Sequence, residues 1–198
     1  MRERTDAWPL MFDNIYASKS PNFDTRPNAL LVAAIEGRPP GRALDIGMGQ
    51  GRNAVALAAK GWAVTGVDVS AEGLAVARAQ AARAGLTITA VQDTVEHFDA
   101  GTNRWDVIAV IYGPGVIADP DYVARLHRSL RPGGIVVVES FASDRSELQR
   151  RPVDVDPDEL RRAFAGFRIL TFEDAKGVSD WDPQTTRLVR LVAQKNPG

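Results

Sequence analysis

The sequence has 198 residues, of which 44% are hydrophobic and 25% charged, a composition that suits one well-buried globular domain with a small appendage at most. Its 24 Lys and Arg against 25 Asp and Glu give a formal charge of -1, so the chain lacks the basic footprint of a nucleic-acid-binding protein. Cysteine is absent and there are only two histidines, which excludes disulfides and thiolate chemistry and argues against a metal site. The first residues lack the apolar core of a signal peptide, and no stretch approaches the length of a membrane span. We therefore expect a cytoplasmic protein.

Two helices are expected before the first strand, joined by a loop around residues 21–27. From residue 42 onward, short apolar runs alternate with longer amphipathic ones, and this alternation predicts strands and helices in turn. The predicted strands cover residues 42–47, 62–68, 87–93, 105–112 and 134–140, and the predicted helices 50–61, 71–85 and 119–130. Ser70 is expected to cap the helix that it precedes, and Gly61 and Gly85 to end their helices. Strands separated by helix-length segments imply right-handed crossovers and a parallel sheet.

The pattern changes after residue 140. Residues 141–157 are polar and are expected to form a surface excursion, followed by a helix over 157–166. Strands over 167–175 and 186–195 are expected to pair as an antiparallel hairpin at the sheet edge. The predicted fold class is α/β: a Rossmann-like three-layer sandwich with a mostly parallel seven-stranded sheet and an antiparallel C-terminal hairpin. We expect residues 1–40 to form a helical cover over the ligand-binding edge of a domain spanning residues 41–198.

The stretch "ALDIGMGQGRN" at residues 43–53 places three glycines in the first turn from strand to helix. In open parallel sheets this turn cradles the ligand, because Gly47, Gly49 and Gly51 expose bare backbone and the next helix offers free N–H groups. Plain turn geometry is the alternative explanation of the glycines. A dinucleotide fingerprint needs a further Gly where Arg52 stands, which argues against nicotinamide-dependent reduction.

Three acids at the ends of successive predicted strands narrow the choice of ligand. Asp45, two residues before the first glycine, repels phosphate but attracts an ammonium or sulfonium ion. Asp68 stands where an acid accepts hydrogen bonds from ribose hydroxyls, and Asp93 can accept a proton from an adenine amine. Together they describe a ligand with a cation at one end and adenosine at the other, which is the shape of S-adenosylmethionine. Asp45 can also cap the neighbouring helix, and the two roles are compatible.

Four motifs in register resemble those of the class I S-adenosylmethionine-dependent methyltransferases: "LDIGMGQGRNAVALA", "GVDVS", "VQDTVEHF" and "LRPGG". The resemblance covers about residues 25 to 195, nearly a whole domain. Within the superfamily, "GxGRN" followed by "LAAKGWAVTGVDVS" is most similar to the small-molecule branch that includes tellurite-resistance and thiopurine methyltransferases. The resemblance implies cofactor-binding roles for Asp45, Gly47, Met48, Gly49, Asp68, Val69, Asp93, Thr94, Val95, Ile111 and Tyr112.

Other candidate residues are weighed against ordinary structural roles. Tyr112 can face the sulfonium through its ring, where cation–π attraction helps to orient the methyl group, or it can simply pack. It is the only candidate catalytic residue. Arg26 can pair with the carboxylate of the cofactor, although a loop Arg is more often solvated. His97 lies on a turn that leads away from the reacting centre and His127 in a helical pattern, so neither is expected to act as a base.

The predicted function is methyl transfer from S-adenosylmethionine to a small thiol, oxyanion or hydroxyl acceptor, with S-adenosylhomocysteine as the second product. In-line displacement needs alignment and a dry pocket more than acid–base chemistry. The segment "VIYGPG" lacks the Asn/Asp-Pro-Pro-aromatic sequence of methyltransferases that act on base amino groups, so no nucleic-acid partner is expected. No membrane partner is expected either, and the protein is expected to be a monomer or a homodimer. The alternative is an S-adenosylmethionine-binding sensor or partner subunit without catalysis.

Overall fold

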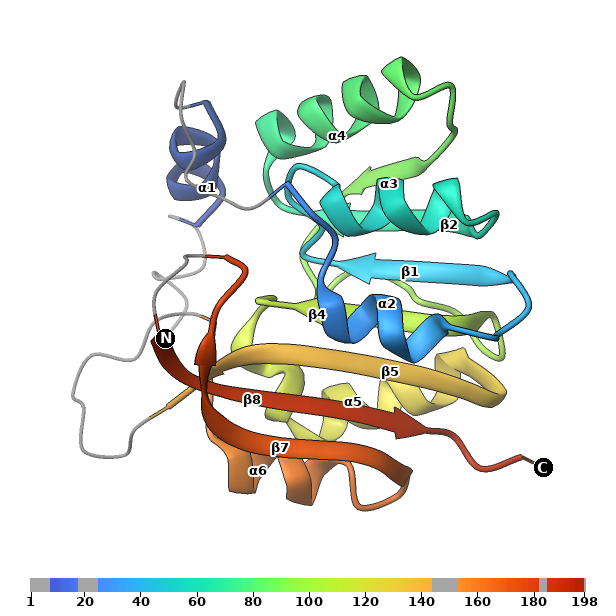
Figure 1. The fold of residues 1–198 in the computed structure, drawn as a ribbon, viewed down its shortest axis with the longest axis vertical. Coiled ribbons are helices and arrows are strands. Elements are labelled where there is room, and N and C mark those ends of the chain that lie inside the picture. Colours follow the sequence, from blue (N-terminus) through green and yellow to red (C-terminus); the bar gives the residue numbers. More distant parts are fainter. Residues whose placement is uncertain (1–7, 18–24, 144–152, 182–184, 198) are drawn as a thin grey trace.

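The computed structural model describes residues 8–17, 25–143, 153–181 and 185–197. A single eight-stranded sheet runs in the order β3-β2-β1-β4-β5-β8-β7, with β6 beside β5 (Figure 1). Strand β8 is antiparallel to both of its neighbours, and the remaining pairs are parallel. The strands are β1 (Arg42–Ile46), β2 (Ala63–Asp68), β3 (Thr89–Gln92), β4 (Trp105–Ile111), β5 (Leu130–Ala142), β6 (Asp154–Val155), β7 (Arg168–Val178) and β8 (Thr185–Gln194).

The prediction of a mostly parallel sheet ending in an antiparallel hairpin is confirmed. One part of it is wrong, because the expected surface excursion over 141–157 contains the eighth strand, β6. Phe141 and Ala142 at the end of β5 pair with Asp154 and Val155, and Val155 is buried. A strand of two residues is too short to show an alternating apolar pattern. Strand β6 forms because it pairs with the end of β5, and the sequence of residues 154–155 does not reveal that pairing.

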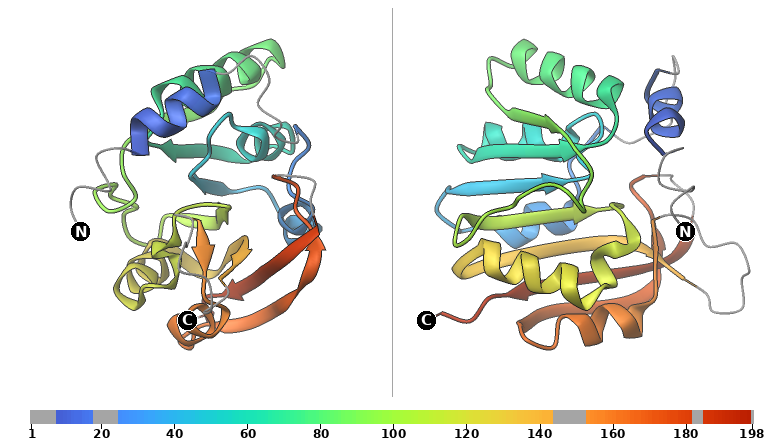
Figure 2. Two further views of the ribbon diagram at one scale, coloured as in Figure 1. Left: turned by 90° about the vertical axis from the view of Figure 1, so that its left-hand side faces the viewer. Right: turned by 180° about the vertical axis from the view of Figure 1, so that it is seen from behind.

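Helices cover both faces of the sheet, as two views from other directions show (Figure 2). They are α1 (Trp8–Ala17), α2 (Ala29–Ile35), α3 (Arg52–Ala59), α4 (Ala71–Arg83), the short 3₁₀ helix η1 (Gly115–Ala118), α5 (Pro120–Ser129) and α6 (Pro157–Ala163). Side chains of α2 and α3 pack on one face, whereas η1, α5 and α6 pack on the other. Among the described residues, no helix has the length and apolar character needed to cross a bilayer.

Local sequence signals explain where several helices begin and end. The Ser70 hydroxyl accepts the Gly73 N–H at 3.0 Å at the start of α4, as predicted. Asp119 and Asp156 cap α5 and α6 in the same way, each followed by Pro at the first helical position. Gly61 and Gly85 both have positive φ just beyond the ends of α3 and α4, the conformation that favours glycine there.

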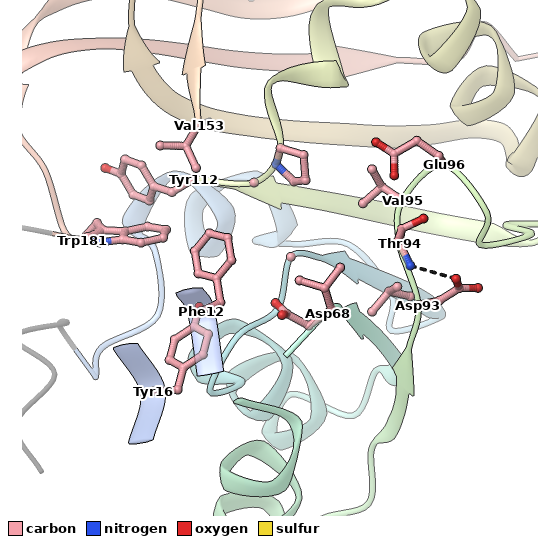
Figure 3. A pocket seen from close by; sticks show the side chains of 15 residues that line it. Phe12, Tyr16, Asp68, Asp93, Thr94, Val95, Glu96, Tyr112, Val153 and Trp181 are labelled. Atoms are coloured by element: carbon pink, nitrogen blue, oxygen red, sulfur yellow. Dashed lines mark hydrogen bonds between the residues drawn. The ribbon is translucent and has the colours of Figure 1, made fainter. Parts of the chain in front are cut away.

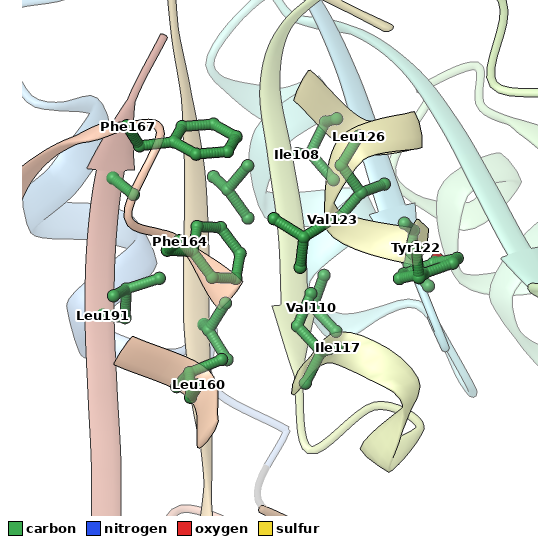
Figure 4. Close-up of a cluster of buried hydrophobic side chains, with 14 of the residues drawn as sticks. Ile108, Val110, Ile117, Tyr122, Val123, Leu126, Leu160, Phe164, Phe167 and Leu191 are labelled. Carbon is green, nitrogen blue, oxygen red and sulfur yellow. The ribbon is translucent and has the colours of Figure 1, made fainter. Parts of the chain in front are cut away.

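The larger core cluster joins the α5–α6 side of the sheet to the strands beneath it (Figure 4). Val123 and Leu126 of α5 point toward Ile108 and Val110 of β4, and Phe164 lies beside them after α6. Burying so many aliphatic and aromatic groups supplies most of the favourable free energy of folding. This core holds the strands of the sheet in place. The polar loops follow the carboxyl ends of these strands and are therefore held in place as well.

Of the two N-terminal helices, α1 lies where the sequence predicts and α2 does not. Helix α1 lies at the ligand-binding edge and packs against α4, where the Asp13 carboxylate accepts the Ser70 hydroxyl at 2.5 Å. Helix α2 instead buries Leu31 and Ile35 on the face of the sheet. Its apolar sequence "ALLVAAI" explains the difference, since a helix with so little polar surface is more stable inside a core.

Candidate functional site

Two adjoining pockets open at the carboxyl ends of the parallel strands, one of about 690 Å³ and one of about 570 Å³. Both are lined by Tyr16, Gly47 and Trp181. The larger pocket runs along the ends of β2, β3 and β4 (Figure 3), and the smaller one lies over the loop between β1 and α3. This edge is where open α/β sheets bind their ligands.

The glycine loop has the open backbone that the sequence predicts at two of its three glycines. Gly47 and Gly49 have φ of +70° and +50°, and the N–H of Gly49 donates to Asp68 Oδ2 at 2.7 Å. A Cβ on Gly49 would lie 2.5 Å from the Tyr16 hydroxyl, so any side chain there would fill the space between the loop and α1. The loop is therefore built for close approach.

Gly51 has a different role from the one expected. A Cβ at this position would lie 2.7 Å from the Cβ of Ala77, and Gly51 lines neither pocket. The third glycine lets α3 approach α4 rather than exposing backbone to a ligand. Spacing alone does not distinguish these roles, because the contact comes from a residue 26 positions away in sequence.

Asp68 joins the loop to the larger pocket. Its second oxygen, Oδ1, accepts the Ser70 N–H at 2.9 Å, and its side chain lines the pocket. Burial raises the pKa of Asp68, and the N–H groups of Ser70, Gly49 and Val69 oppose that rise by stabilising the anion. A carboxylate accepts about four hydrogen bonds, so after these three N–H groups about one acceptor site remains for a hydroxyl group of a ligand.

Asp45 lies beneath the loop and is 1% exposed. Burial raises its pKa to about 7, which the nearby Arg52 opposes and Asp68 reinforces. The backbone N–H of Ala54, in the first turn of α3, also opposes the rise in pKa. One carboxylate oxygen, Oδ2, is buried without a hydrogen-bond partner, and such an atom invites a cationic or hydrogen-bonding group.

The third predicted acid and its neighbours also line the larger pocket. Asp93 Oδ1 accepts the N–H of Thr94 at 2.8 Å (Figure 3), and Val95 adds an apolar wall. Val69 lines the same pocket, whereas Met48 and Ile111 line the smaller one.

Arg26 lines neither pocket. Its carbonyl accepts Arg52 Nη1 at 3.1 Å. The structure thus brings the predicted residues together except for the buried Asp45 and for Arg26.

Tyr112 combines strain with a strong hydrogen bond. Its φ of +50° is rare for an aromatic residue and is typical of functional sites. The phenol donates to Glu139 Oε1 at 2.6 Å, and burial together with the Glu139 charge raises the pKa of Tyr112. The phenol therefore stays protonated at neutral pH and is not a general base. What the residue offers the pocket is the surface of its ring.

Three aromatic residues at the pocket, Phe12, Tyr16 and Trp181, were not assigned to the site from sequence. Phe12 projects from α1 into the larger pocket, and Trp181 meets the ring of Tyr112 edge to face at 5.6 Å. Trp181 follows Asp180, whose carboxylate binds Arg52 Nη2 and Asn28 Nδ2, each at 2.8 Å. A Trp in an otherwise polar loop was the only signal available in the sequence.

The histidines lie away from the pockets, as expected. His97 is exposed, and His127 packs edge to face on Phe167 with centroids 4.9 Å apart. Burial lowers the pKa of His127. The part of the chain that the structure describes holds no group of three His, Cys, Asp or Glu side chains able to bind a metal.

Comparison with known proteins agrees with this geometry. A family described as "Methyltransferase domain" matches residues 43–134, which include the glycine loop and all three acids. Residues 43–134 of the chain are thus similar to a methyltransferase domain. The cofactor of class I methyltransferases is S-adenosylmethionine.

Individual relatives extend this picture. A ubiquinone biosynthesis O-methyltransferase from Pectobacterium atrosepticum is 38% identical over 117 residues, covering 56% of this chain and 48% of the relative. The chain thus spans about half the length of the curated relatives that it matches. TehB from Haemophilus influenzae has a TM-score of 0.74 at 17% identity, covering 95% of this chain and 67% of that one. A structure from work on echinomycin biosynthesis has a TM-score of 0.71 at 24% identity, covering 95% and 91%.

The residues around the two pockets fit S-adenosylmethionine. The unpartnered Asp45 Oδ2 provides a negative group for the ammonium end of the cofactor, and Asp68 has spare acceptor capacity for the ribose. Gly47 and Gly49, which carry no side chain, both line the smaller pocket. These are three independent features of the described residues, and each matches a different part of the same molecule.

Proposed function

We propose that this protein transfers a methyl group from S-adenosylmethionine to a small-molecule acceptor. The observation that carries the proposal is Asp68, whose carboxylate is fixed by the N–H groups of Gly49 and Ser70 and lines the larger pocket. An acid held so firmly at the end of the second strand is the feature that distinguishes a nucleoside site from a turn.

Each end of the proposed cofactor has residues to hold it. Asp68 would accept a ribose hydroxyl, and Asp93 and Val95 would bind and cover the adenine. Gly47, Gly49 and the buried Asp45 would hold the amino-acid end, with Met48, Val69, Thr94 and Ile111 completing the walls. When bound, S-adenosylmethionine supplies an electrophilic methyl carbon on a sulfonium.

The chain's own contribution to transfer is alignment and exclusion of water. Phe12, Tyr112 and Trp181 give the larger pocket an aromatic wall, which keeps the reacting groups dry and restricts their orientation. The Tyr112 phenol donates its proton in a hydrogen bond to Glu139, so Tyr112 does not act as the base in the reaction. An acceptor that ionises readily suits such a site.

We also propose that the protein acts in the cytoplasm, as a monomer or a homodimer, without nucleic-acid or membrane partners. The near-zero net charge supports the absence of a polyanionic partner. The Pectobacterium relative is an O-methyltransferase, and this similarity supports an oxygen acceptor among the thiol, oxyanion and hydroxyl classes.

The test is a transfer assay with S-adenosylmethionine carrying a deuterated methyl group. Small thiols, phenols, alcohols and oxyanions are screened by mass spectrometry for a labelled product and for S-adenosylhomocysteine. The proposal predicts acceptor-dependent formation of both products, lost in Asp68→Ala. Saturable cofactor binding without turnover of any acceptor would favour a non-catalytic binding protein, and labelling of bulk RNA alone would also contradict the proposal.

A further inference from the structure

The larger pocket has two chemically different ends. The end near Asp68 and Asp93 is polar and is assigned to the cofactor in the function proposed above. The other end is formed by residues that this assignment leaves unused, and they come from four separate parts of the chain. These are Phe12 of α1, Tyr112 and Pro114 after β4, Val153 before β6 and Trp181 after β7. We refer to these five residues as the apolar wall.

The apolar wall contains three aromatic rings, and their arrangement is fixed by other contacts. Tyr112 packs on Phe141 with centroids 4.9 Å apart and on Trp181 at 5.6 Å, while its hydroxyl is bound to Glu139. Phe12 lies 6.2 Å from Tyr16 in a stacked pair. Each of the three rings thus packs against another aromatic ring, which restricts its motion and lowers the entropic cost of binding a ligand.

Trp181 is held by a buried polar network rather than by packing alone. Asp180 beside it binds Arg52 and Asn28, and Asn28 also donates to Glu139 Oε1 at 3.1 Å. Glu139 in turn accepts Arg190 Nε at 2.6 Å. The same carboxylate thus supports Tyr112 and, through Asn28 and Asp180, the segment that carries Trp181.

The charges around the larger pocket discriminate between acceptors. Its charged lining side chains, within the described ranges, are all acidic: Asp68, Asp93 and Glu96. The nearest lining cation, Arg52, belongs to the smaller pocket and is paired with Asp180. An anionic acceptor would therefore meet repulsion from these three carboxylates.

A cationic acceptor is disfavoured for a different reason. A nucleophile needs a free lone pair, which an ammonium lacks, and the positive sulfonium of the donor repels a second cation in the same low-dielectric pocket. Glu139, the acid nearest the apolar wall, is already bound to Arg190. What remains is a neutral acceptor whose flat apolar surface matches the rings.

Resting on the proposed function, we infer that the acceptor is a neutral, planar aromatic compound bearing a hydroxyl or thiol, bound against the apolar wall of Phe12, Tyr112 and Trp181. In the reaction a lone pair on the acceptor oxygen or sulfur forms the new bond to carbon. The carbon–sulfur bond of the donor breaks, its electron pair stays on sulfur, and the acceptor proton passes to water. Aromatic hydroxyls and thiols ionise more readily than aliphatic alcohols, so such an acceptor does not require a base from Tyr112.

Binding of unreactive complexes tests this inference without relying on turnover. Calorimetric titrations are made on the protein saturated with S-adenosylhomocysteine, using 2-naphthol, its saturated counterpart decahydro-2-naphthol, and 6-hydroxy-2-naphthoate. We expect 2-naphthol to bind at least about tenfold more tightly than either of the others. Equal binding of the saturated compound would overturn the requirement for planarity, and equal or tighter binding of the carboxylate would overturn the requirement for neutrality.

Variants then locate the binding surface. Phe12→Ala and Trp181→Ala are each expected to weaken 2-naphthol binding about tenfold, whereas Trp181→Phe, which retains a ring, should lose about threefold. Leu170→Ala, an exposed position on β7, is the control and should bind as the wild type does. Unchanged binding in both alanine variants would contradict the location.

The titrations distinguish failure of the proposed function from failure of the inference about the acceptor. If S-adenosylhomocysteine binds but no naphthol does, the inference about the acceptor is wrong while the proposed cofactor site stands. If S-adenosylhomocysteine itself does not bind, the proposed function fails.

Discussion

At the scale of single residues, Asp45 is the group whose chemistry depends most on its surroundings. An ordinary Asp has a pKa near 3.9, whereas burial raises that of Asp45 to about 7. Between these values the folded protein holds a proton that the unfolded chain has released. The stability contributed by the protonated form is therefore present at low pH and is lost as the pH rises through 7.

This shift predicts how the stability of Asp45→Asn compares with that of the wild type. Relative to the variant, which does not titrate, the wild type should lose about 2 to 3 kcal/mol of unfolding free energy between pH 5 and pH 8. Urea denaturation at several pH values measures the difference. Parallel pH profiles for the two proteins would show that Asp45 does not titrate in this range.

The proposed cofactor reverses the sign for binding. An ammonium beside Asp45 favours the ionised carboxylate, so the ratio of wild-type to Asp45→Asn affinity for S-adenosylmethionine should rise close to tenfold between pH 6 and 7.5. Taking the ratio cancels ionisation of the ligand itself. A ratio that is flat across this range would place the ammonium elsewhere.

The sequence predicts the role of a residue correctly where that role depends on residues close to it along the chain. Ser70 caps α4 through a contact three positions along the chain, and Asp68 lies at the end of a strand that its apolar run predicts. Sequence reasoning missed Trp181, because the contact with Tyr112 spans 69 positions and depends on how the β7–β8 hairpin packs. The left-handed conformation of Tyr112 was equally hidden, since local sequence favours an ordinary strand end.

At the scale of elements, Gly51 shows how a residue of the ligand loop can serve helix packing. It has φ of +80°, and a Cβ would lie 2.7 Å from that of Ala77. Gly85 provides a matched control, with φ of +68° and no atom within 4 Å of the added carbon. Alanine at Gly85 introduces only backbone strain, whereas alanine at Gly51 adds a collision between α3 and α4. Comparing the two substitutions therefore separates the two effects.

We predict that Gly85→Ala lowers the unfolding free energy by about 1 to 2 kcal/mol, the cost of a left-handed alanine. Gly51→Ala should lower the unfolding free energy by about 1 to 3 kcal/mol more than Gly85→Ala does, because α3 and α4 must separate. Equal losses in urea denaturation would show that α3 and α4 adjust without cost.

The connection between α3 and the β7–β8 hairpin is a second prediction at this scale. Arg52 and Asp180 pair at 2.8 Å with side chains 17% and 23% exposed. A double-mutant cycle with alanine at both positions should give a coupling energy of about 1 kcal/mol or more. The more exposed Arg187–Asp174 pair serves as the control, with an expected coupling near 0.5 kcal/mol. A smaller coupling for Arg52 and Asp180 than for the control would contradict their proposed role in holding Trp181.

The elements themselves were largely predictable because alternating apolar runs and caps are local signals. Strand β6 and the position of α2 were not, since each depends on a partner surface supplied by the sheet. In both cases burial against distant residues decided the outcome, which a single sequence does not encode locally.

At the scale of the whole molecule, the chain places a polar nucleoside site and an aromatic wall at one edge of a single sheet. The sheet order brings β1, β2, β3 and β4 side by side, so Asp45, Asp68, Asp93 and Tyr112 reach the same edge from distant positions. The acids hold the proposed cofactor, and the rings leave room beside it for a flat acceptor. Function in this account follows from topology as much as from any one motif.

The most direct test is calorimetric titration of S-adenosylhomocysteine into the wild type, Asp68→Ala and Asp68→Asn, with Asp121→Ala at an exposed helix start as the control. Circular dichroism establishes that each variant is folded at the temperature used. We expect binding to the wild type and the control, with affinity at least about tenfold weaker in both Asp68 variants because charged hydrogen bonds contribute about 1.5 to 3 kcal/mol each. No binding to the wild type, or equal binding to folded Asp68 variants, would contradict the assignment of the glycine loop and Asp68 to the cofactor.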